Sequence, residues 1–154
     1  MARLDEISLY RQFLWARELR AEYRQEHLAH EDLFARAHRG EVGSYEQGFR
    51  PDMYMCLWYG VLNVVAEGYE ELGLTNPEVD KLLSQPERDL LRRFRNAVFH
   101  PTSHKDRRLE EMVRAGEQSR AWVDSLTDAM AAYFASIEET DRESRLPSTG
   151  KTPR

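Results

Sequence analysis

Proline and glycine cluster at only a few points of this chain, and no stretch between those points alternates apolar and polar residues for long. A half-buried strand alternates with a period of two, whereas an amphipathic helix repeats every three to four residues, so this pattern predicts an all-α fold. Four main helices with short connections imply an up-and-down four-helix bundle with one short extra helical turn. We expect a single domain over residues 1–140 and a polar, disordered tail over residues 141–154.

The breaks between the periodic stretches define the expected helices. Pro51 and Asp52 suit the first turn of a helix, and Gly73 suits its C-terminal cap. Ser84 is expected to cap the next long helix, which must end just before Pro101 because proline disfavours helical geometry in the residue before it. The expected segments are a first helix over 4–39, an almost wholly apolar and therefore central helix over 51–72, a short turn over 77–83, a third helix over 84–100 and a fourth over 106–139.

Composition is typical of a globular protein, with 41% hydrophobic and 32% charged residues. No apolar run approaches the roughly 20 residues of a membrane span, and the N-terminus lacks the apolar core of a signal peptide. Cys56 is the single cysteine, which excludes an internal disulfide and a cysteine-based zinc site. We expect Cys56 to be a buried, inert thiol and the protein to be cytoplasmic, without a membrane partner.

Positive charge is concentrated in one part of the chain. The formal net charge is −5, yet the segment Arg88–Arg108 carries seven basic residues against two acids, which leaves −10 for the remainder. A basic stripe on an acidic body suits a phosphate-bearing ligand. The alternative interpretation is a solvated, arginine-rich helix face.

Within this stripe lies the sequence RNAVFHPT, residues 95–102, at the expected end of the third helix. Asn96 and His100 are four residues apart, so on a helix they share a face, and the Asn96 amide is expected to orient the imidazole. Arg95 lies one step round the helix. An imidazole can transfer protons near neutral pH, and a guanidinium can hold a phosphate. In RNA, the 2′-hydroxyl of the substrate can act as the nucleophile.

These residues resemble the signature of the HEPN superfamily, small helical-bundle domains marked by arginine, four to six residues, then histidine, often with asparagine after the arginine. The resemblance is to uncharacterised bacterial HEPN-like proteins and covers residues 54–102, including "EGY" and "LLRRFRNAVFH". It implies a metal-independent endoribonuclease without cofactors, with a composite site across a homodimer and roles in toxin–antitoxin systems or phage defence. By this resemblance, Arg95 contacts the scissile phosphate, His100 transfers protons and Asn96 supports the site.

Several partners follow from the same resemblance. They are a second copy of the chain, RNA or a nucleotide, and a protein antitoxin or regulator. Some HEPN members are not catalytic, so the alternative function is a dimeric helical module that binds a nucleotide, a nucleic acid or a protein.

Other polar residues are candidates for supporting roles. The expected phosphate-binding residues around the motif are Arg92, Arg93, Lys105 and Arg107. Glu67 lies in a strongly apolar segment and needs a partner, for which Arg92, Arg93 and Arg95 are candidates, unless it faces solvent at the bundle edge. His104 can join His100, although a solvated loop position is favoured.

Histidines and aromatic residues elsewhere allow two further interpretations. His27, His30, Glu31 and His38 have spacings that permit zinc binding, but a polar helix face is the favoured interpretation and no metal site is predicted. The aromatic and methionine side chains of the second helix are expected in the core and at a dimer interface. These residues are Met53, Tyr54, Met55, Trp58, Tyr59 and Tyr69.

Overall fold

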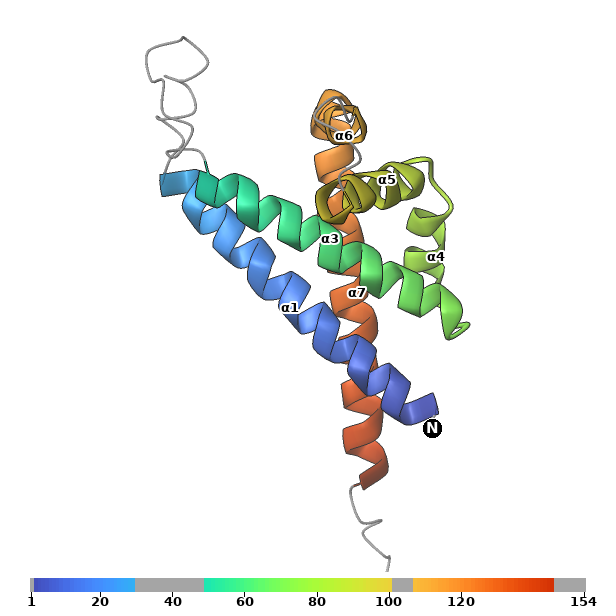
Figure 1. The fold of residues 1–154 in the computed structure, drawn as a ribbon. Helices are drawn as coiled ribbons and strands as arrows, with labels where there is room; N and C mark the ends of the chain where they lie inside the picture. The colour runs from blue at the N-terminus through green and yellow to red at the C-terminus, as the bar shows by residue number, and fades with distance from the viewer. Residues whose placement is uncertain (1, 30–48, 101–106, 146–154) are drawn as a thin grey trace, which may run out of the picture.

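The structure is a computed structural model that describes residues 2–29, 49–100 and 107–145. Every regular element in these ranges is a helix, which confirms the all-α prediction. The helices are α1 (Ala2–Ala29), α3 (Phe49–Glu71), α4 (Pro77–Leu83), α5 (Glu87–Phe99), α6 (Arg108–Arg114) and α7 (Gly116–Arg145) (Figure 1). None of the described helices is both long and apolar enough to cross a membrane.

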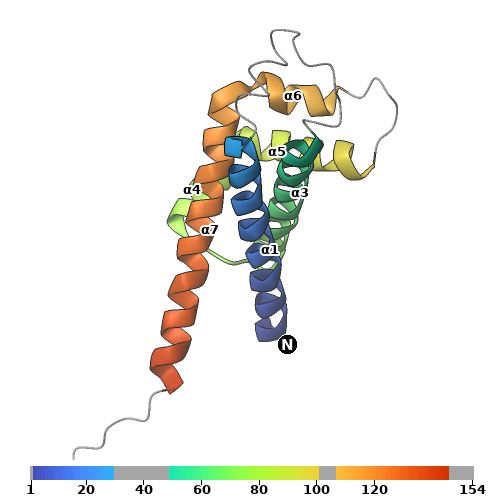
Figure 2. The same cartoon turned by 90° about the vertical axis from the view of Figure 1, so that its left-hand side faces the viewer.

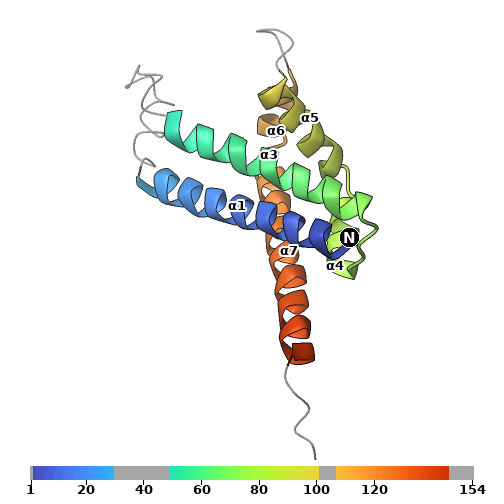
Figure 3. The same ribbon diagram turned by 60° about the horizontal axis from the view of Figure 1, so that its bottom comes forward.

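Helices α1 and α3 lie side by side and run in opposite directions (Figures 1 and 3). Helix α7 crosses this pair, and its C-terminal end extends past the N-terminus of α1 (Figure 2). Helices α4 and α5 lie on one side of α7, and α6 packs against α5 near the start of α7. Helix α5, which carries the motif, is therefore held between α3 and α6.

Helix α3 is the buried helix that its apolar sequence predicts. Leu62, Val65 and Ala66 have no exposed surface, and Trp58 is only 2% exposed. The indole Nε1 of Trp58 donates a hydrogen bond to Thr127 Oγ1 on α7 at 3.2 Å. This hydrogen bond supplies the partner that a buried indole N–H requires, and it fixes α7 against α3.

The aromatic residues of α3 pack mainly inside the chain itself. Trp58, Tyr59 and Tyr69 are each at most 2% exposed, so the predicted core role is confirmed for them. Their burial removes them from the surface that could contact a second copy. Tyr54 and Met55 are half-buried and remain at the margin of the core.

Turn and cap residues explain several helix ends. Asn76 Oδ1 accepts hydrogen bonds from the backbone N–H groups of Glu78 and Val79, which confirms the helical start at Pro77. Gly73 has φ +63, the left-handed conformation expected of a C-terminal cap after α3. The prediction that Ser84 caps the third helix is wrong. Its hydroxyl donates to Lys81 O as the C-cap of α4, and α5 begins after Pro86.

The predicted fourth helix is divided into α6 and α7. Gly116 has φ +65, a value that breaks the helix and that side-chain-bearing residues rarely adopt. Helix α7 continues to Arg145, so the predicted start of a disordered tail at residue 141 is wrong. Residues 146–154 and the predicted helical segment 30–39 lie outside the described residues.

Candidate functional site

The RNAVFH motif lies at the C-terminal end of α5. Leu91, Phe94 and Ala97 are buried and hold this helix on the core. The backbone N–H of His100 donates to Asn96 O at 2.8 Å and closes the last turn. His100 itself has φ −136 and ψ 65, so the helix ends at Phe99, directly before the residue that precedes Pro101.

Arg95 is bonded to the residue that follows it. Its Nη1 donates to Asn96 Oδ1 at 2.9 Å, and both side chains are half-buried. The Nε of Arg95 is buried and has no hydrogen-bond partner in the structure. A buried donor without a partner is costly and calls for an explanation. Asn63 Nδ2, in the core of α3, is a second buried donor of this kind. Arg95 therefore combines a permanent charge with unused hydrogen-bonding capacity.

The predicted contact between the Asn96 amide and the His100 imidazole is absent from the described hydrogen bonds. Two physical reasons account for this difference. The backbone of His100 is not helical, so the rule that residues four apart share a face fails at this position. The Asn96 carbonyl oxygen is also already occupied by Arg95. His100 is exposed, and its side chain is free of constraint by Asn96.

The other arginines of α5 are paired with carboxylates. Arg92 Nη2 lies 2.6 Å from Asp89 Oδ1, and Arg93 Nη2 lies 2.7 Å from Glu111 Oε1 on α6. These side chains are about half exposed, so the pairs add little to stability, but they lower the local positive charge. Arg95 differs from both because no carboxylate in the described ranges pairs with it.

Arg88 has a structural role that its sequence position did not indicate. Its guanidinium donates to Asn63 Oδ1 at 2.6 Å and to Glu70 Oε2 at 2.9 Å. Asn63 is fully buried in α3, and the Arg88 side chain is only 11% exposed. This network fixes the angle between α3 and α5. Arg88 therefore belongs to the scaffold of the site rather than to a ligand-binding surface.

Glu67 does not have the arginine partner that its apolar surroundings predict. The three candidate arginines are engaged with Asp89, Glu111 and Asn96, and Glu67 is half-buried on α3 without an ion pair to any described residue. A half-buried side chain keeps part of its surface in contact with water. The interpretation of Glu67 as an acid at the bundle edge is therefore the better one.

Two contacts near the motif could not be read from the sequence. Arg108, the first residue of α6, donates from Nη2 to the backbone oxygen of His100 at 3.2 Å, and so connects α6 to the end of α5. Phe99 packs its ring against Gly60 of α3, although it is 45% exposed. Glycine leaves space for a neighbouring side chain, and this is the signal in the sequence that could have indicated the contact.

Of the remaining residues that the sequence singled out, the structure describes Arg107 and His27. Arg107 is exposed at the start of the α6 region, as a phosphate-binding residue should be. Lys105, His104, His30, Glu31 and His38 lie outside the described residues. His27 stacks on Tyr23 with ring centroids 5.5 Å apart. The described residues contain no group of three or more His, Cys, Asp or Glu side chains arranged to hold a metal ion.

Cys56 has the character of the inert thiol that was predicted. It is half-buried in α3, and this burial, with a smaller contribution from the charge of Asp52, raises the pKa of its thiol to about 11. The thiolate is the reactive form of cysteine, so its population at neutral pH is very small.

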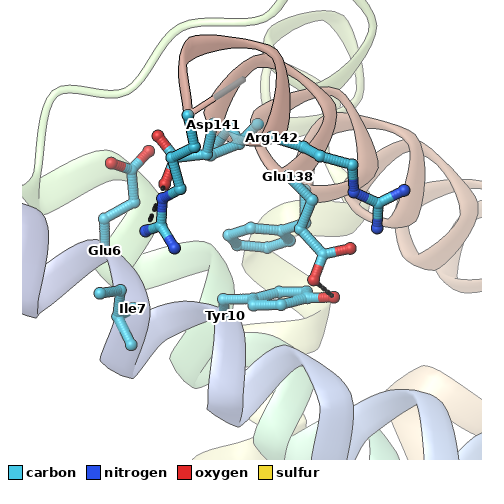
Figure 4. A pocket seen from close by; sticks show the side chains of 9 residues that line it. Glu6, Ile7, Tyr10, Glu138, Asp141 and Arg142 are labelled. Atoms are coloured by element: carbon cyan, nitrogen blue, oxygen red, sulfur yellow. Dashed lines mark hydrogen bonds and ion pairs between the residues drawn. The ribbon is translucent and has the colours of Figure 1, made fainter. Parts of the chain in front are cut away.

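A cleft of about 560 Å³ opens between the start of α1 and the end of α7 (Figure 4). Its apolar floor includes Ile7 and Tyr10, and charged side chains form its rim. The Tyr10 hydroxyl donates to Glu138 Oε1 at 2.9 Å, and Arg145 Nη2 lies 3.7 Å from Asp141 Oδ2. These rim groups thus satisfy one another, and the cleft is distant in the chain from the motif.

Comparisons of this chain with models of known protein families, with curated proteins and with solved structures find no match.

Proposed function

We propose that this chain is a metal-independent endoribonuclease of the HEPN type that acts as a homodimer. In this proposal, α1, α3, α5 and α7 are the four helices of an up-and-down HEPN-like bundle. Arg95, Asn96 and His100 form one half of a composite site, and a second copy of the chain supplies the other half. Toxin–antitoxin or defence roles in the cytoplasm belong to the same proposal.

The observation that carries the proposal is the state of Arg95. Among the arginines that the structure describes on α5, Arg92 and Arg93 pair with carboxylates and Arg88 binds Asn63 and Glu70. Arg95 alone of these four has no carboxylate partner among the described residues: it is bonded to Asn96 Oδ1 and keeps a buried Nε donor unused. An un-neutralised guanidinium of this kind can bind a phosphate with little loss of existing interactions.

The proposed reaction uses the RNA 2′-hydroxyl as nucleophile. His100 of one protomer takes the proton of the hydroxyl, whose oxygen attacks the adjacent phosphorus and expels the 5′-oxygen of the next nucleotide. The second copy of His100 gives a proton to this leaving oxygen, and Arg95 stabilises the negative charge that develops on the phosphate. The products are a 2′,3′-cyclic phosphate and a 5′-hydroxyl, so no metal or external nucleophile is consumed.

The experiment is cleavage of a labelled mixed RNA pool in EDTA by the wild type, His100→Ala, Arg95→Ala and Arg92→Ala. Arg92 is the matched control: the sequence places it among the expected phosphate-binding residues, but on the same helix, one turn from Arg95, its charge is paired with Asp89. We expect cyclic-phosphate ends from the wild type and Arg92→Ala and at least a roughly 100-fold loss for the other two variants, since each removes a direct catalytic contribution of this size. Equal cleavage by all four proteins contradicts the proposal.

The second candidate is a non-catalytic dimeric helical module that binds a nucleotide, RNA or a protein regulator. It is favoured by one observation, the engagement of Asn96 with Arg95 instead of His100, which leaves the imidazole unoriented. RNA binding that depends on Arg95, without cleavage and without any effect of His100→Ala, supports this candidate over the enzyme.

A further inference from the structure

A second cavity, of about 380 Å³, lies where the end of α1, the start of α3, α5 and the break between α6 and α7 meet. Its volume falls in the range of about 300–1,000 Å³ that is usual for small-molecule sites. Gly116, the left-handed residue with which α7 begins, forms part of its wall, so the helix break that the sequence did not predict helps to shape this space.

Aromatic rings form the walls of this cavity. Tyr23 and His27 of α1 stack with their centroids 5.5 Å apart and their planes at 27°. Tyr59 of α3 and Phe94 of α5 are tilted against each other at 5.4 Å. Rings from three helices thus converge on one space. Such walls favour a flat, polarisable ligand that can stack on them.

The hydroxyl of Tyr59 is the polar group in this cavity that lacks a partner. Tyr59 is only 2% exposed, yet no described residue forms a hydrogen bond with its hydroxyl. The oxygen is not among the fully buried polar atoms without a partner, which are Asn63 Nδ2 and Arg95 Nε, so it keeps some accessible surface at the cavity. Burial also raises the pKa of Tyr59, so the group stays protonated and can donate. The chain thus places an unused donor at the wall of the cavity.

Groups of opposite charge complete the lining. Asp52 is an exposed residue in the first turn of α3, where no described residue forms an ion pair with it, and partial burial of its carboxyl group raises its pKa. Arg120 of α7 lies near Tyr23: burial raises the pKa of the Tyr23 hydroxyl, and the charge of Arg120 opposes this effect. The cavity therefore offers an acceptor in Asp52 and donors in Arg120 and Tyr59.

The cleft in Figure 4 and the aromatic cavity differ in how far their polar groups are already bonded. In that cleft Tyr10 is bonded to Glu138, and Arg145 Nη2 lies 3.7 Å from Asp141 Oδ2. In the aromatic cavity, Tyr59 and Asp52 are left without partners among the described residues. A ligand gains more from unused donors and acceptors than from groups that must first break existing bonds.

We propose that the aromatic cavity binds a purine nucleoside with guanine as its base. The two adjacent N–H donors on the guanine edge match the two oxygens of the Asp52 carboxylate, and the guanine carbonyl oxygen accepts from Tyr59 or Arg120. The flat base stacks between the aromatic walls. Adenine lacks the paired donors, and uracil presents one donor between two acceptors, so both match a carboxylate poorly. This site is separate from Arg95 and does not depend on RNA cleavage.

The test is calorimetric titration of the full chain with guanosine, adenosine and uridine. The variants are Asp52→Asn and Tyr59→Phe, and the matched control is Asp89→Asn, an exposed α5 carboxylate that does not line the cavity. Circular dichroism establishes that each variant is folded. Tyr59→Phe removes one hydroxyl that has no partner among the described residues, so it provides a test even if Asp52→Asn does not fold.

The expected result is guanosine binding at least about ten-fold tighter than adenosine or uridine binding. Loss of a hydrogen bond to a charged group corresponds to about a ten-fold change in Kd, so we expect this loss for Asp52→Asn, a smaller loss for Tyr59→Phe and none for Asp89→Asn. No binding of guanosine by the wild type overturns the proposal. Equal binding of all three nucleosides, or guanosine binding unchanged in both cavity variants, overturns it as well.

Discussion

Arg95 donates a hydrogen bond from Nη1 to Oδ1 of Asn96, its neighbour in the chain, at 2.9 Å. The two residues that open the motif are therefore bonded to each other, and His100 lies beyond the helix end with a non-helical backbone. Asn96 is better described as a residue that positions Arg95 than as one that orients the imidazole. Its neutral oxygen holds the guanidinium without cancelling its charge.

Asn96→Asp tests this role of Asn96. The substitution keeps the size of the side chain but turns the acceptor into a carboxylate, which pairs with Arg95 and neutralises it. We expect RNA affinity to fall at least about ten-fold. The slope of log affinity against log salt concentration should become shallower by about one, since one cation that contacts phosphate is removed. The measurement is titration of a labelled RNA at several salt concentrations.

Asp89→Asn is the matched control for this titration, because it removes a negative charge from the same helix and releases Arg92. We expect this control to bind RNA at least as tightly as the wild type. Unchanged affinity of Asn96→Asp would show that Arg95 does not contact phosphate.

The Arg88–Asn63 hydrogen bond predicts a large difference between two arginines of α5. Arg88→Ala leaves Asn63, which is 0% exposed, without the donor for its Oδ1. A buried polar group without its partner costs about 1–3 kcal/mol, so we expect unfolding free energy to fall by about 2 kcal/mol. Arg92→Ala breaks only an exposed pair, worth at most about 1 kcal/mol. Urea denaturation of both variants measures the difference, and equal midpoints would contradict it.

The sequence predicted those parts of the fold that depend on local chemistry. The apolar run of α3, the cap at Asn76 and the stop before Pro101 all depend on a few neighbouring residues, and the helix bounds follow them. Ser84 was assigned to the wrong helix because its hydroxyl can cap either the end of α4 or the start of α5. Local sequence does not distinguish these two uses.

The parts of the site that the sequence did not predict depend on contacts between distant residues. Arg88 was indistinguishable from Arg95 as a charge in the sequence, and only the packing of α3 on α5 gives it Asn63 as a partner. The aromatic cavity is formed by residues of α1, α3, α5 and α7. The sequence of any one helix therefore cannot predict it. Gly116 was the one local signal, and it was obscured by the helical period on either side of it.

The close approach of Phe99 to Gly60 predicts that two substitutions are coupled. A Cβ atom at Gly60 would overlap the Phe99 ring, which is 45% exposed and can move outward. Replacing a helical glycine with alanine gains about 1 kcal/mol of helix propensity. In the wild-type background, loss of the ring contact offsets this gain, so we expect little net change from Gly60→Ala. In the Phe99→Ala background, we expect the full gain of about 1 kcal/mol.

Unfolding free energies of Gly60→Ala, Phe99→Ala and the double variant form the thermodynamic cycle for this test. Additive effects, with no coupling beyond error, would show that the Phe99 ring does not depend on Gly60 for its position.

The raised pKa of Cys56 predicts that stability decreases in alkaline solution. Burial raises the thiol pKa from its ordinary 9.0 to about 11, so between these values the unfolded chain loses the proton while the folded chain keeps it. The contribution of this group to stability is complete below pH 9 and is lost as the pH rises to about 11. For one group, the free energy of unfolding cannot fall by more than about 1.4 kcal/mol per pH unit, and the partial exposure of Cys56 makes the fall smaller.

Urea denaturation at half-unit steps from about pH 8 to about pH 11 measures this loss, and Cys56→Ala is the variant that isolates it. The pKa of Tyr133 is also raised by burial, to about 12. Its ionisation therefore lowers the free energy of unfolding too, but chiefly above pH 10.0, the ordinary pKa of tyrosine. Between the ordinary thiol value of 9.0 and the ordinary tyrosine value of 10.0, we therefore expect the stability of Cys56→Ala to change less with pH than that of the wild type. Identical slopes for the two proteins in this interval would mean that the Cys56 thiol is not protected by burial.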